Sequence, residues 1–319
     1  PRPHPRRRAR LGSTMIGALT LLAAALAAEP QAHWVPTADG AWVYLERHAG
    51  AGPAVVLCHG ISSNHHFWDL APGRSLADHL QAAGYDVWNL DLRGHGPARD
   101  DPEGRRQRAG WSVDDYGRHD LPAAFAHIAA ARGDAGPAHY VGHSMGGMVL
   151  AVYLATAEQT PLRSAVVVGS PLDFRDADPL TRMVLAGAVF GRATPFLPTP
   201  LGARIVARFR RTPLHVDDLL FNPAHIEPAA RKAMYRAIVS PLSRGEIRQF
   251  GRMVRDGEFR PADGGEPWRA QLAHVQVPMR FIAGRADRIA PPDRVWSYHE
   301  AIGSPVRDFV VAGASNGFV

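Results

Sequence analysis

The sequence predicts an α/β fold whose sheet is mainly parallel and flanked by helices. Strand-like apolar segments alternate with helix-like segments along most of the chain, which is typical of a parallel sheet. The run Ala54–Cys58 is apolar throughout, as a strand buried on both faces requires. The 319 residues, 46% of them hydrophobic and 21% charged, suffice for one large core with an insertion.

The elements are expected in the following order. Besides 54–58, the pattern predicts strands at 41–46 (an early edge strand), 85–90, 138–141, 164–169, 278–284 and 306–311, and helices at 76–83, 121–131, 148–157 and 294–302. Residues 34–172 and 271–319 are the two parts of the predicted core. Between them, 173–270 is helix-rich and punctuated by proline, with no obvious strand pattern. It predicts a helical cap inserted between the sixth and seventh sheet strands.

Residues 1–33 are expected to be an export signal with a short linker. Five arginines lie in the first ten residues, before the apolar stretch Met15–Ala27, and Ala25 and Ala27 offer an A-x-A cleavage site. That stretch is too short to span a bilayer as a helix. If the signal is genuine, the protein is exported to the periplasm or the medium, and otherwise it is cytoplasmic.

The charge and the cysteine content limit the classes of partner that the sequence supports. The formal net charge is +6, but the leader supplies most of it, so the sequence gives no support for a nucleic-acid partner. The later basic cluster Arg204–Arg211 is interpreted as a solvated helix face, with peripheral contact of the cap with anionic lipid as the alternative. Cys58 is the one cysteine and is expected to be a buried, inert thiol.

The segment 138–147, AHYVGHSMGG, contains the pattern G-x-S-x-G between a predicted strand and a predicted helix. A serine hydroxyl is a weak nucleophile unless the fold holds it within reach of a base, and a sharp strand-to-helix turn does this at a strained backbone position. The neighbouring positions must be nearly free of side chains, which Gly142 and Gly146 provide. Ser144 is therefore the candidate nucleophile.

The segment 57–61, LCHGI, places a glycine directly after a buried strand, so that the next backbone N–H can point into the site. Acyl transfer builds negative charge on the carbonyl oxygen, and two fixed N–H donors stabilise it. We assign these donors to Ile61 and to Met145, the residue after the nucleophile. His59 is interpreted as a structural residue of this loop.

Two further clusters receive structural interpretations. The segment Asp91–Gly96 combines an acid with a histidine, but it predicts a tight, charge-paired loop in which Gly94 and Gly96 adopt unusual dihedral angles. His65 and His66 lack partner ligands at a matching spacing, so they are expected to line a loop near the pocket. No metal site is predicted.

A nucleophilic serine needs a histidine base, and that histidine needs an acid to fix its tautomer. Asp287 follows the predicted strand 278–284 and comes later in the chain than Ser144, which matches the order Ser, Asp, His. Asp173, after the preceding strand, is the alternative acid. The structural alternative for Asp287 is a helix-capping or salt-bridging carboxylate.

From Trp34 to the end, the motifs resemble those of the α/β-hydrolase superfamily in their order. The segments 75–88 (SLADHLQAAGYDVW) and 240–245 (SPLSRG), followed by 249–250 and 257–259, resemble the acid-lipase branch. The resemblance implies an α/β-hydrolase fold. It also implies cleavage of small-molecule or lipid carboxylic esters through an acyl-serine intermediate, without a metal or organic cofactor.

The family pattern also implies a histidine in the loop after the last strand. Here that strand is predicted to end near Val311, and no histidine follows it. His299 lies in the preceding helix, where it should face solvent or pack on the sheet. We expect that the catalytic histidine lies beyond Val319 and that the chain is a fragment open at both ends. As printed, it should fold but be essentially inactive on esters.

Two other functions fit the same residues. An acyltransferase or a C–C bond hydrolase would keep the fold and change the chemistry. A non-catalytic hydrolase-fold protein that binds lipid or a partner would lack the histidine altogether. The sequence leaves the acyl chain length and the oligomeric state open.

Overall fold

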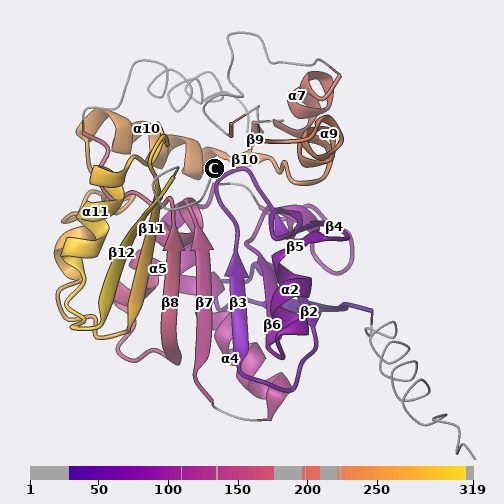
Figure 1. Ribbon diagram of the computed structural model, residues 1–319, viewed down its shortest axis with the longest axis horizontal. Coiled ribbons are helices and arrows are strands. Elements are labelled where there is room, and N and C mark those ends of the chain that lie inside the picture. Colours follow the sequence, from indigo (N-terminus) through magenta and orange to yellow (C-terminus); the bar gives the residue numbers. More distant parts are fainter. Residues whose placement is uncertain are drawn as a thin grey trace, which may run out of the picture. The chain divides into compact units, whose positions relative to one another are not determined.

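The computed structural model describes residues 29–108, 110–133, 136–175, 196–197, 199–208, 221–222 and 225–313. Within this part of the chain, an eight-stranded sheet has the order β1-β2-β6-β3-β7-β8-β11-β12 (Figure 1). The strands are β1 (Gln31–Pro36), β2 (Trp42–His48), β3 (Ala54–Cys58), β6 (Asp86–Asp91), β7 (Ala138–His143), β8 (Leu162–Val168), β11 (Met279–Gly284) and β12 (Arg307–Ala312). From β6 to β12 all pairings are parallel, whereas β2 pairs antiparallel with both β1 and β6, which confirms the mainly parallel sheet.

Helices cover both faces of the sheet. The apolar side chains on both faces of β3 show why this covering is needed. Successive side chains of a strand point to opposite faces. Val56 and Cys58 belong to the larger hydrophobic cluster, which includes residues of α4 (Leu121–Arg132), α5 (Met145–Thr156) and α11 (Pro292–Ala301). Val55 and Leu57 belong to a second cluster with residues of α2 (Leu76–Ala82). Both faces of the central strand are therefore buried.

The segment between β8 and β11 carries the cap elements that the structure describes. They are β9 (Phe196–Leu197), α7 (Thr199–Val206), α9 (Pro228–Ala237), β10 (Leu242–Ser243) and α10 (Arg244–Asp256). Figure 1 shows them above the carboxyl ends of β3, β7 and β8. Ser62 Oγ donates to the carbonyl of Ser240 at 2.6 Å, and Asn64 Nδ2 donates to the carbonyl of Ala237 at 2.9 Å. These bonds tie the cap to the loop after β3.

Smaller elements complete the core. They are η1 (His65–Phe67), β4 (Asp69–Ala71), β5 (Arg74–Ser75), η2 (Gly96–Arg99), α3 (Val113–Asp115), the π-turn η3 (Tyr116–Asp120) and η6 (Trp268–Gln271). The hairpin of β4 and β5 precedes α2 directly. Its two strands pair antiparallel, apart from the main sheet.

The structure corrects four sequence expectations. The early edge strand is β1, and the segment predicted as the edge is β2, which pairs with β1 on one side and β6 on the other. β1 begins at Gln31, inside the expected leader, because residues 31–36 pair along their whole length with β2. The cap contains a short strand pair, β9 with β10. The helix expected from Met148 begins at Met145, because Gly146 and Gly147 belong to its first turn.

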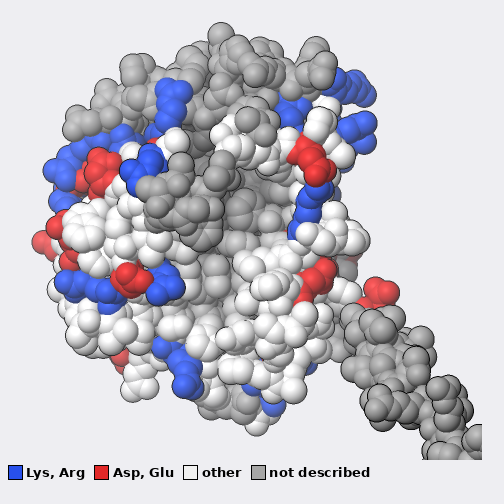
Figure 2. Space-filling model, in the orientation of Figure 1, with Lys and Arg blue, Asp and Glu red and all other residues white. Residues whose placement is uncertain are grey.

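Most of the expected leader, residues 1–28, lies outside the described residues, as do 209–211 of the basic cluster. On the face shown in Figure 2, acidic and basic side chains are interspersed over the described surface. Among the described residues, no helix combines the length and the apolar character needed to cross a bilayer.

Candidate active site

Ser144 occupies the turn between β7 and α5. Its backbone has φ 50° and ψ −114°, and apart from Ser62 it is the one described residue other than glycine with a positive φ. This conformation is sterically unfavourable for a side chain and persists only where the surroundings enforce it. The amide of Ser144 donates to the carbonyl of Val168 at 2.8 Å, which fixes the turn to the end of β8.

The glycines around Ser144 are required by close packing. A Cβ on Gly146 would lie 2.6 Å from the carbonyl oxygen of Cys58, and one on Gly142 would lie 2.8 Å from the carbonyl carbon of Gly146. A Cβ on Gly147 would collide with Ser170. Real Cβ atoms do not approach backbone so closely, so the spacing in the motif follows from the contact between α5 and the ends of β3 and β8.

The loop after β3 lies directly against this turn. A Cβ on Gly60 would come within 3.3 Å of Ser144 Cβ and 2.9 Å of His143 Nδ1. Within the described part of the chain, neither the amide of Ile61 nor that of Met145 donates a hydrogen bond. Met145 is the first residue of α5, where amides have no partner within the helix and the helix dipole favours negative charge. Each candidate donor is therefore adjacent in sequence to a residue at the turn: Met145 follows Ser144, and Ile61 follows Gly60.

The two candidate acids have different surroundings. Asp287 follows β11, and its Oδ1 accepts hydrogen bonds from the amides of Ile289 and Ala290 at 2.9 and 2.8 Å. Its Oδ2 and His143 Nε2 both approach the Cα of Gly169, where a Cβ would lie 3.5 and 3.9 Å from them. Asp287 is thus held beside the end of β8, on the same edge of the sheet as Ser144.

Asp173 is engaged elsewhere. Its carboxylate accepts from the side chain and the amide of Arg175, and its backbone forms an isolated bridge with Glu258. Burial acts to raise the pKa of Asp173, but hydrogen bonds from Arg175 outweigh it, so the net pKa lies below its usual value. An acid already paired with a guanidinium is a poorer partner for a histidine.

No described histidine forms a hydrogen bond with Ser144. His59 is fully buried, with Nδ1 2.8 Å from the carbonyl of Gly60 and Nε2 3.3 Å from the amide of Leu92. Burial lowers the pKa of His59 to about 3, so it is a neutral, structural residue as expected. His299 packs against Trp296 and Phe309, also as expected.

His143 lies beside the nucleophile position, but it is packed as an aromatic ring. It stacks on Phe67 with ring centroids 4.4 Å apart, and its Nδ1 has no hydrogen-bond partner among the described residues. Burial lowers the pKa of His143 to about 4. His143 is therefore neutral at neutral pH and offers Ser144 an aromatic neighbour without a charge.

The loop Asp91–Gly96 is a structural, charge-paired turn, as the sequence predicts. Asp91 is fully buried and accepts from the amide and the Nδ1 of His65, both at 2.6 Å. Burial acts to lower the pKa of His65, but the adjacent Asp91 carboxylate reverses this and raises it to about 9. Gly94 and Gly96 have φ values of 82° and 47°, in the left-handed region. Cys58 is fully buried, and burial raises its pKa to about 12.

Sequence reasoning missed the buried contact between cap and core at Glu246. This carboxylate is fully buried in α10, accepts from the amide of Ser243 at 2.7 Å, and lies 3.5 Å from His95 Nε2. Burial acts to lower the pKa of His95, but Glu246 reverses the effect, so the net pKa lies above its usual value. The spacing Ser243-x-x-Glu246 is that of a capping box and was the available signal.

A strained serine at a strand-to-helix turn, on the carboxyl edge of a mainly parallel sheet beneath a helical cap, defines the class of α/β hydrolases. Residues 53–316 match the family described as alpha/beta hydrolase fold. The chain belongs to this family.

Curated relatives match a shorter segment. Lipase 3 of Drosophila melanogaster is 33% identical over 126 residues, which cover 37% of this chain and 31% of that protein. Human gastric triacylglycerol lipase is 38% identical over 102 residues, covering 30% of this chain and 25% of that protein. The matches span about a third or less of the relatives' length. They agree with the acid-lipase resemblance of the sequence motifs.

Solved structures match nearly the whole chain. A hydrolase from Pseudomonas aeruginosa has a TM-score of 0.58 at 21% identity and covers 89% of this chain and 91% of its own. An esterase from Exiguobacterium antarcticum has a TM-score of 0.58 at 17% identity, covering 88% and 90%. At this identity the similarity shows the fold.

Proposed function

We propose that this protein is a serine hydrolase that cleaves carboxylic esters, of the esterase or lipase type, with Ser144 as nucleophile and Asp287 as the acid of the triad. The observation that carries the proposal is the strained backbone of Ser144 at φ 50°, next to a loop and a helix start with two amides that have no acceptor among the described residues. Strain of this kind concentrates at functional sites.

The chemistry follows from these positions. Ser144 Oγ attacks the ester carbonyl carbon while its proton passes to a histidine base, and the amides of Ile61 and Met145 stabilise the negative oxygen of the tetrahedral intermediate. The histidinium then protonates the leaving alcohol, and an acyl-serine remains. Water attacks the acyl-serine by the reverse sequence and releases the acid. Among the described residues, no histidine is placed as this base.

The substrate class is supported by two lines. The curated relatives that match are named lipases, and the motif segments resemble the acid-lipase branch. Near Ser144, Phe67, Met145 and neutral His143 give the site an apolar, uncharged character. Apolar, water-poor surroundings suit an acyl chain and strengthen the oxyanion contacts.

The test is ester turnover by the native protein that contains this chain, with p-nitrophenyl butyrate as substrate. Ser144→Ala should reduce turnover by a factor on the order of 10⁶, because no residual nucleophile remains. Ser164→Ala is the matched control, since this hydroxyl lies in β8 and bonds to His139. A fluorophosphonate should label Ser144 covalently. Wild-type turnover in Ser144→Ala, or no ester turnover by the native protein, would overturn the proposal.

A second assay uses the printed 319-residue chain. It is expected to be folded and essentially inactive. Ser144-dependent turnover by this chain would show that a histidine within it acts as the base, and would leave the proposed function intact.

A further inference from the structure

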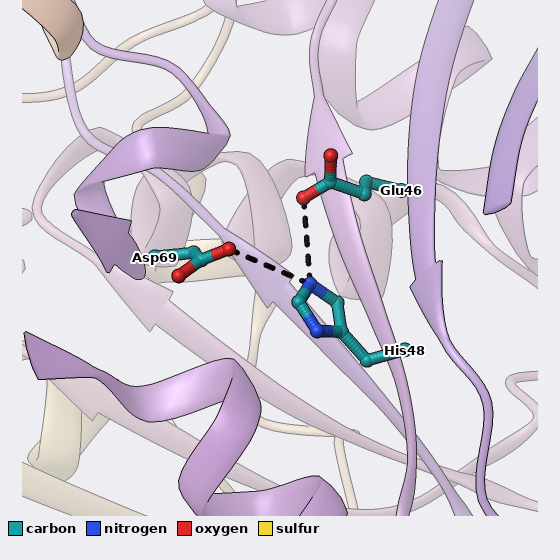
Figure 3. A group of neighbouring side chains, drawn as sticks. All are labelled: Glu46, His48 and Asp69. Carbon is teal, nitrogen blue, oxygen red and sulfur yellow. Dashed lines mark hydrogen bonds and ion pairs between the residues drawn. The ribbon is translucent and has the colours of Figure 1, made fainter. Parts of the chain in front are cut away.

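We propose that Glu46, His48 and Asp69 form a site for one divalent cation of the zinc type, away from the proposed catalytic serine. In Figure 3 the two carboxylates face one nitrogen of the His48 ring from different sides. One ligand atom from each residue lies within 4.8 Å of the others. One imidazole and two carboxylates are ligands that Zn²⁺ accepts, with a fourth position open to water.

The distances leave room for a shared cation, although His48 Nε2 and Glu46 Oε1 also form a long hydrogen bond. His48 Nε2 is 3.4 Å from Glu46 Oε1 and 3.8 Å from Asp69 Oδ2. Strong N–H···O bonds are about 2.7–3.2 Å long, so both contacts are long for direct bonds. Ligands 2.0–2.1 Å from a tetrahedral Zn²⁺ are separated by about 3.3 Å. Small side-chain movements would therefore seat a cation between the three atoms.

The other ring nitrogen of His48 is also placed as in a metal site. Asp78 Oδ1 lies 3.4 Å from His48 Nδ1. Histidines that bind metals usually donate their other N–H to a carboxylate, which fixes the ring and the tautomer. The His48 side chain is 3% exposed, so its orientation is held by packing as well.

The charge around the cluster calls for a cation. Glu46, Asp69 and Asp78 surround one histidine, and no lysine or arginine in the described part of the chain forms an ion pair with any of the three carboxylates. The nearest other cationic group, His65, is 4.0 Å from Glu46 and is already paired with Asp91. Three carboxylates around one histidine leave an excess of negative charge even when His48 is protonated, and a divalent cation would neutralise it.

Two elements supply the three ligands, and a third supplies Asp78 behind the His48 ring. Glu46 and His48 are two positions apart in β2, which places them on the same face of the strand. Asp69 begins β4, and Asp78 lies in the first turn of α2. A cation here would clamp the β4–β5 hairpin to the main sheet, two residues from Phe67, which stacks on His143 beside Ser144.

The test is zinc binding by the purified chain after treatment with a chelator and gel filtration, measured by competition with a chromophoric chelator. The stripped wild-type chain should bind one equivalent of added Zn²⁺, and its thermal midpoint should rise with Zn²⁺ because a ligand of the native state stabilises it. Ca²⁺, which prefers six to eight oxygen ligands, should not produce this rise.

Variants decide whether these residues hold the cation. The double substitution Glu46→Gln with Asp69→Asn removes two ligands and preserves shape, and His48→Gln removes the third. Each should lose the bound equivalent and the thermal shift. His79→Gln is the matched control, because this histidine is exposed on α2 beside Asp78. Circular dichroism establishes that each variant is folded. Because His48 is buried, the variant of the less buried carboxylate pair is the decisive one.

Two results would overturn the proposal. If the wild-type chain binds no Zn²⁺, the cluster is a protonated histidine paired with carboxylates. If the folded double variant binds Zn²⁺ as the wild type does, or His79→Gln abolishes binding, the cation is adventitious and bound at the surface. Neither result bears on Ser144, so the proposed function is tested separately.

Discussion

The turn at Ser144 and the cluster at Glu46 stand at the two ends of η1, and they treat charge in opposite ways. At the turn, His143 and His59 are buried and the pKa of each is lowered, so the imidazoles stay neutral. At the cluster, three carboxylates surround His48. The strained backbone lies at the Ser144 turn, whereas the densely placed charges lie at the Glu46 cluster. The difference matches the two proposed roles, ester cleavage at the turn and cation binding at the cluster.

The three residues of η1 separate these regions. His65 faces the charged side, 4.0 Å from Glu46 and 2.6 Å from Asp91. Phe67 faces the other side and stacks on His143. One short helix therefore packs against both sites, and substitutions can test whether the two are independent.

The largest effect should come from Asp287→Asn. This variant tests which carboxylate is the acid of the triad proposed at Ser144. An amide holds a histidine in the wrong tautomer, so ester turnover by the native protein should fall by about 10⁴. Asp173→Asn is the paired variant and should keep turnover near the wild-type value, because Arg175 occupies that carboxylate. If the two results exchange places, Asp173 is the acid. Zinc binding should persist in both variants.

Gly60→Ala should have the next largest effect. The new Cβ would lie 2.9 Å from His143 Nδ1 and 3.3 Å from Ser144 Cβ, which would push the Ile61 amide out of position. Displacing one oxyanion donor typically lowers turnover by about 10²–10³. Gly251→Ala is the control, because a Cβ there meets no atom within 4 Å. Wild-type turnover in Gly60→Ala would mean that the loop after β3 does not supply an oxyanion donor at Ser144.

The smallest effect is the contribution of His143 to the pH dependence of the free energy of unfolding. Burial lowers the pKa of His143 from 6.5 to about 4, so below pH 6.5 the unfolded chain binds more protons than the native chain. The free energy of unfolding should therefore fall by about 2 kcal/mol as pH drops from 6.5 to 4 through this residue. His143→Phe keeps an aromatic ring on Phe67 and should flatten the curve, measured by urea unfolding across this range. An unchanged slope would show that His143 is protonated in the native state.

The sequence alone predicted most of the sheet and the core helices, because strands buried on both faces leave continuous apolar runs. It also predicted the turn at Ser144, the glycines beside it and the structural role of His59. The sequence prediction was wrong at β1, whose first residues were assigned to the leader. It was also wrong at the start of α5, which was placed at Met148. Gly146 and Gly147 are poor helix formers in isolation. Only their close contacts with Cys58 and Ser170 explain why glycines stand in the first turn of α5.

What the sequence by itself determined is local: a serine between small residues at the end of a strand has few conformations open to it, and 138–147 carries that constraint within ten residues. Tertiary structure decided the partners across the fold. Asp91 pairs with His65, 26 positions away, and Asp69 comes to His48 from another element. Such contacts depend on how strands and loops pack, and a single sequence records no distance between residues far apart along the chain.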